Sequence, residues 1–89
     1  MDAPLALSAT HSHLFPGARG HAEAPLRDGP VTLAFADGTR VAGWLRGGRL
    51  GLEAHETAKG AKMPAKCWSV EAGPPGPDGR VPFRVAARA

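Results

Sequence analysis

Two glycine-containing turns, set between segments of alternating apolar and polar residues, constrain this chain most strongly. The segment Ala36-Asp37-Gly38 predicts a three-residue hairpin loop, because Gly38 can adopt the left-handed conformation that closes it. The pair Gly47-Gly48 predicts a two-residue hairpin turn, in which both positions require a positive φ. The flanking segments alternate with the period of half-buried strands. Together these features predict an antiparallel meander.

The two turns also determine which residues face each other across the strands. The first turn pairs Leu33 with Val41, and the second pairs Leu45 with Leu50. One face of the sheet then collects the apolar side chains of Val31, Leu33, Phe35, Val41, Leu45, Leu50 and Leu52. Two turns assigned separately give the same apolar face, and this agreement supports the register. Trp44 falls on the opposite, polar face.

Strand character returns at residues 66–71 and at residues 80–88, which brings the expected number of strands to five. An open sheet of this size would leave its apolar face in water, whereas closure covers it. We therefore predict an all-β domain over residues 30–89, a small antiparallel five-stranded meander in a partly closed, SH3-like or OB-like barrel. Pro82 lacks an N–H group, so it is expected at a sheet edge or a strand start. The alternative is an α+β fold with a short helix near residues 53–62.

Residues 1–29 show no sustained period, because proline and glycine interrupt every stretch. Such a segment is typical of a flexible arm ahead of the domain. The competing interpretation is that residues 12–15 add an edge strand or that Phe15 docks onto the core.

Composition restricts the cellular setting. The single cysteine, Cys67, excludes a disulfide within the chain, and a small domain without disulfides is typical of the cytoplasm. Residues 1–15 lack the basic segment and continuous apolar run of a secretory signal. No apolar run approaches the roughly 20 residues that cross a bilayer, so no membrane partner is expected. The net charge of +3 makes this a basic protein that can attract an anionic partner.

The basic residues and one tryptophan form the candidate binding surface. Three lysines lie within eight residues, and two arginines flank the glycine-glycine turn. The candidate binding residues are Trp44, Arg40, Arg46, Arg49, Lys59, Lys62 and Lys66. Lysines at this spacing can meet successive phosphates, and an exposed tryptophan can stack on a base. The plainer interpretation is that these charges only solvate a surface loop.

Other residue types give no recognised chemistry. His11 and His13 lie in the segment that is expected to be least ordered, and zinc needs about four ligands in fixed geometry. Cys67 has no evident base or cation on its own face of the strand. We predict no metal, no cofactor and no catalytic residues. An enzymatic site would require an oligomer in which His55 and Cys67 line a shared cleft.

These observations favour a non-enzymatic binding or adaptor module that uses the lysine loop and the Trp44 face. Its partner is either a protein or a nucleic acid, and the sequence does not choose between them. One alternative is a small barrel that binds nucleic acid. Another is a self-associating structural protein, a homo-oligomer whose last strand forms the interface.

Overall fold

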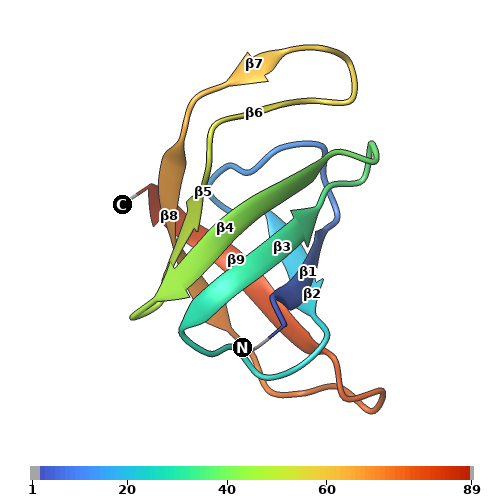
Figure 1. The fold of residues 1–89 in the computed structure, drawn as a ribbon. Coiled ribbons are helices and arrows are strands. Elements are labelled where there is room, and N and C mark those ends of the chain that lie inside the picture. The colour runs from blue at the N-terminus through green and yellow to red at the C-terminus, as the bar shows by residue number, and fades with distance from the viewer. Residues whose placement is uncertain (1–2, 89) are drawn as a thin grey trace.

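The computed structural model describes residues 3–88, which form a closed β-barrel with a small hairpin at one end (Figure 1). The barrel order is β1-β2-β9-β8-β5-β4-β3. Its strands are β1 (Leu5–Ala9), β2 (Arg19–Ala22), β3 (Gly29–Ala34), β4 (Arg40–Arg46), β5 (Arg49–Leu52), β8 (Lys66–Ala72) and β9 (Val81–Arg88). The hairpin consists of β6 (His55–Glu56) and β7 (Lys62–Met63).

The predicted meander is confirmed in β3, β4 and β5. Leu33 lies opposite Val41, and Leu45 lies opposite Leu50. Gly38 has a φ of 92°, and its N–H donates to the Phe35 carbonyl, as the three-residue loop requires. The glycines of the second turn have φ values of 56° and 79°. The turn chemistry therefore fixes the register that buries the apolar face.

The prediction of a flexible arm over residues 1–29 is wrong for the strands it contains. β1 pairs in parallel with β3 and antiparallel with β2, and β2 pairs with β9. The five predicted strands are present as the antiparallel run β3-β4-β5-β8-β9, but β1 and β2 join them. The barrel is therefore closed and has seven strands with one parallel pair, where the sequence predicted five strands and partial closure. In β1, Leu5 and Leu7 are buried and Ala6 is exposed, a strand pattern too short to stand out between prolines and glycines.

The alternative with a helix near residues 53–62 is also wrong, since this segment forms the β6–β7 hairpin (Figure 1). Gly60 closes the hairpin with a φ of 86°, and the Thr57 N–H donates to the Ala61 carbonyl over 2.8 Å. A left-handed glycine ends a helix, and the segment has no apolar stripe to bury one. The part of the chain that the structure describes contains no helix long and apolar enough to cross a membrane.

Small residues permit the tight closure of the barrel. A Cβ atom at Gly43 would overlap the Gly51 carbonyl, and one at Gly20 would overlap the Phe83 ring. The close approach of the β5 backbone explains why a glycine lies in the middle of β4. Pro82 is the second residue of β9, opposite His21, so its strand-start position is confirmed while both sides of β9 are paired. Self-association through a free edge of β9 has no support from this register.

Candidate ligand-binding cavity

A cavity of about 340 Å³ opens at the hairpin end of the barrel. Three segments meet there: the β1–β2 connection, the β3–β4 turn and the β6–β7 hairpin (Figure 1). The volume lies in the range of small-molecule sites, roughly 300–1,000 Å³. We call this space the end cavity; its lining consists of Ser12, His13, Leu14, Phe35, Asp37, Leu52, His55, Thr57, Lys59, Ala61, Met63, Pro64, Lys66 and Trp68.

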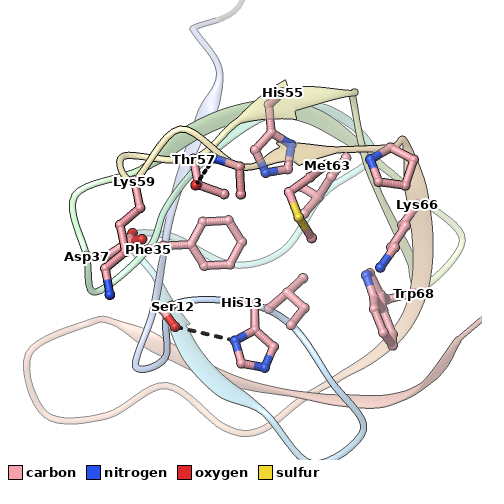
Figure 2. Close-up of a pocket in the computed structure, with 14 residues that line it drawn as sticks. Ser12, His13, Phe35, Asp37, His55, Thr57, Lys59, Met63, Lys66 and Trp68 are labelled. Atoms are coloured by element: carbon pink, nitrogen blue, oxygen red, sulfur yellow. Dashed lines mark hydrogen bonds between the residues drawn. The ribbon is translucent and has the colours of Figure 1, made fainter.

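The floor of the end cavity consists of the core residues nearest the hairpin end of the barrel. Leu14, Phe35, Leu52 and Trp68 are all buried, and each also lines the cavity. Figure 2 shows the Phe35 ring at the centre of the opening, with Trp68 to one side. Met63 reaches the same space from β7 and is half-buried. Side chains fixed by core packing therefore give the cavity an apolar base.

The hairpin wall is held against the barrel by two contacts. The buried Thr39 hydroxyl oxygen accepts a hydrogen bond from the Ala58 N–H at 2.9 Å. The His55 ring stacks on Phe35 with ring centroids 6.4 Å apart and planes 19° apart. The His55 Nδ1 atom also lies 2.9 Å from the Glu53 carbonyl oxygen. These contacts fix the hairpin as one wall of the cavity.

The charged groups at the rim are two lysines and one carboxylate. The Thr39 backbone N–H donates to Asp37 at 3.0 Å. This hydrogen bond, helped by the Thr39 side chain and by the positive charge of Lys59, lowers the pKa of Asp37. Asp37 is thus ionised at neutral pH, and its main partner is the Thr39 backbone of its own turn, with Lys59 a smaller electrostatic contribution. The two lysines outnumber this one carboxylate, so the rim keeps an excess of positive charge.

The predicted site residues do not gather at one place. Lys59 and Lys66 line the end cavity, whereas Lys62 is exposed on the hairpin, opposite Glu56. Arg40 and Arg46 are exposed at the two ends of β4, which are about 20 Å apart at the rise of a strand. Arg49 pairs with Arg46 at the far end.

Trp44 is 42% exposed on the outer face of the barrel, as its register predicted. A Cβ atom at Gly51 would overlap its ring, so the indole lies across this glycine. Trp44 and Arg46 border a second hollow with Asp28, at the opposite end from the end cavity. The tryptophan face and the lysine loop are therefore separate surfaces.

Sequence reasoning missed the residues that the N-terminal segment contributes. Ser12, His13 and Leu14 line the cavity, with the Ser12 hydroxyl oxygen 3.3 Å from His13 Nδ1 (Figure 2). Their only visible signal was the pair of histidines, which points to metal as readily as to a cavity wall. Within residues 3–88, no three potential metal ligands come together.

His55 lines the end cavity, but Cys67 does not. Cys67 lies opposite Gly51 and is offset by one residue from Trp68, so it belongs to the other face of β8.

Comparison with protein-family models, with curated proteins and with solved structures finds no match for this chain. Any functional conclusion therefore depends on the chemistry of the site.

Proposed function

We propose that this protein is a non-enzymatic binding module whose ligand occupies the end cavity. The observation that supports this most directly is a cavity of about 340 Å³ with an apolar floor and lysines at its rim. Ligand sites typically combine such an apolar lining with a few polar groups that orient the ligand. The wall is tied to the barrel through Thr39, so little ordering is needed when a ligand enters.

Filling the cavity tests this function. Ala61 lines the cavity and is exposed, so Ala61→Phe adds a ring to the space without removing any core side chain. Ala58→Phe is the matched control, because Ala58 is exposed on the same hairpin and does not line the cavity. The probe is anilinonaphthalene sulfonate, an apolar anion whose fluorescence rises in apolar surroundings.

We expect the probe to bind the parent protein and the Ala58→Phe variant alike. The Ala61→Phe variant should bind it about tenfold more weakly, which corresponds to about 1.4 kcal/mol. Circular dichroism and urea unfolding confirm that both variants remain folded. Equal binding by both variants would place the probe elsewhere and refute the proposal.

A second candidate function is binding of single-stranded nucleic acid along the outer face of β4. One observation favours it, the 42% exposure of Trp44 between Arg40 and Arg46 on the same strand face. A base can stack on the indole while the arginines contact phosphates. Affinity for an oligothymidylate that falls steeply with salt, and falls again in Trp44→Ala, supports this function. Salt-independent binding or an unchanged Trp44→Ala variant contradicts it.

A further inference from the structure

Lys66 occupies a position in the barrel where a core side chain would be expected. It lies opposite Leu52, which is buried, and two residues before Trp68, which is also buried. Residues two apart on a strand share a face, so Lys66 projects from β8 on the inner side. It is half-buried and lines the end cavity. The sequence therefore places an ammonium group at the mouth of an apolar space.

The other two lysines of the loop each have a carboxylate close by. Lys59 lies near Asp37, where its charge helps to lower the carboxyl pKa (Figure 2). Lys62 lies directly across the hairpin from Glu56. Oppositely charged residues at such positions attract each other and reduce the field available to a ligand. A long polyanion would gain less from this loop than the count of lysines suggests.

Lys66 instead faces the apolar side chain of Leu52 across its strand, and none of the three loop lysines belongs to an ion pair found within residues 3–88. The ion pairs found within residues 3–88 join Arg80 to Glu23 and Arg84 to Glu71, on other parts of the barrel. An ammonium group beside apolar side chains is stabilised when an anion hydrogen-bonds to it. The (CH₂)₄ stem can lie along Trp68 while the ammonium stays at the mouth. Lys66 is thus the rim cation best placed to receive an anion.

We infer that the end cavity binds an apolar group that ends in a single carboxylate, with the carboxylate on Lys66. The inference rests on the proposed function, since it names the ligand class of the same cavity. The hydrocarbon part lies against Phe35, Leu52 and Trp68, where its burial supplies most of the affinity. A cationic ligand would meet the ammonium groups of Lys59 and Lys66. A neutral ligand would leave the anion position on Lys66 unused.

The test uses three probes of equal chain length: octanoate, 1-octanol and octylamine. The protein carries Trp44→Phe, so that Trp68 in the cavity floor becomes its only tryptophan. We expect octanoate to change Trp68 fluorescence with an affinity about tenfold above that of 1-octanol, the effect of about one charge-assisted hydrogen bond. Octylamine should bind more weakly than either. Displacement of anilinonaphthalene sulfonate by octanoate provides a second readout.

Two lysine variants locate the carboxylate. Lys66→Met keeps the apolar stem, so octanoate should lose about tenfold in affinity while 1-octanol keeps its own. Lys62→Met is the matched control: it removes the same charge from the same loop outside the cavity and should change neither affinity. An equal loss of octanoate affinity in both variants would show a general charge effect and overturn the assignment to Lys66.

The outcomes separate the inference from the function on which it rests. Equal affinities for octanoate and 1-octanol would reject the ligand class while leaving a binding cavity in place. Failure of all three probes to change Trp68 fluorescence or displace the dye would reject the cavity as a binding site. A final arm measures the affinities of N-acetyl-Ala-Leu, which ends in a free carboxylate, of its C-terminal amide and of octanoate. If the peptide acid binds more tightly than both its amide and octanoate, the carboxylate is assigned to a peptide C-terminus. Tighter binding of octanoate assigns it to a free aliphatic acid.

Discussion

Truncation of Leu7 to alanine tests whether the N-terminal segment is part of the barrel. Leu7 is 4% exposed and pairs with Ala22 on one side and Leu33 on the other. Leu→Ala changes at buried sites of this kind cost about 2.7–5.0 kcal/mol, because the transfer free energy is lost and a cavity remains. A domain of 89 residues has a free energy of unfolding of roughly 5–13 kcal/mol. Leu7→Ala should therefore remove a large fraction of the stability.

Urea unfolding followed by Trp68 fluorescence, in proteins that carry Trp44→Phe, measures this loss, since Trp68 is buried in the core. Leu7→Val removes less volume and should lose about 1 kcal/mol, which keeps the measurement possible if Leu7→Ala does not fold. Ala6→Ser, on the exposed side of the same strand, is the control and should stay within about 0.5 kcal/mol of the parent. If Leu7→Ala also stays within about 0.5 kcal/mol, the segment is a loose arm and the closed barrel is refuted.

Three further predictions concern the turns and the outer face. Thr39→Val should lower stability by about 0.5–1.5 kcal/mol and speed amide hydrogen exchange at Ala58, since the hydrogen bond that anchors the hairpin is lost. Unchanged exchange at Ala58 would contradict this role. Asp37→Asn should be less stable than the parent at neutral pH, because the lowered pKa of Asp37 means that its ionised form stabilises the fold. That advantage is lost as the pH falls below about 4, so urea unfolding should show the two proteins converging there, and a constant difference would exclude this origin. Gly51→Ala should displace the Trp44 ring and increase its quenching by acrylamide, with a stability loss near 1 kcal/mol or less; unchanged quenching would mean that the ring does not lie across Gly51.

The meander was predictable because its information is local. Gly38 and the glycine pair at 47–48 impose turn geometries that only certain registers satisfy, and the alternating residues between them leave one register that buries the apolar face. Trp44 could be placed outside the core by the same argument, and it is exposed. No long-range information was needed for these elements.

The N-terminal strands were not predictable in the same way, because their burial depends on distant partners. β1 is held by β3, and β2 is held by β9, which is about sixty residues away in the chain. Ala18 and Ala22 are fully buried, yet alanine gives a weak strand signal, since it is small and common at all depths. Gly20 interrupts β2 in the sequence but is required there by the Phe83 ring. The feature that argued against a strand is thus the one that lets two distant segments pack together.

The cavity could not be predicted from the sequence, although the strands that support it could, because its walls lack the pattern that its floor has. Its floor consists of residues from the periodic strands, such as Phe35 and Trp68, which sequence reasoning assigned only to the core. Its walls come from the β1–β2 connection and the β6–β7 hairpin, the two segments without apolar periodicity. Loops that contact a ligand do not need the alternating apolar pattern that core packing imposes on strands, because the rigid strands below hold them in place. Lys66 lies where the periodic strand β8 meets the aperiodic cavity wall. It follows the inward alternation of β8, but it is charged at a position where this alternation predicts an apolar residue. A charge that breaks an otherwise consistent pattern is expected where function opposes packing, and here it identifies the mouth of the cavity.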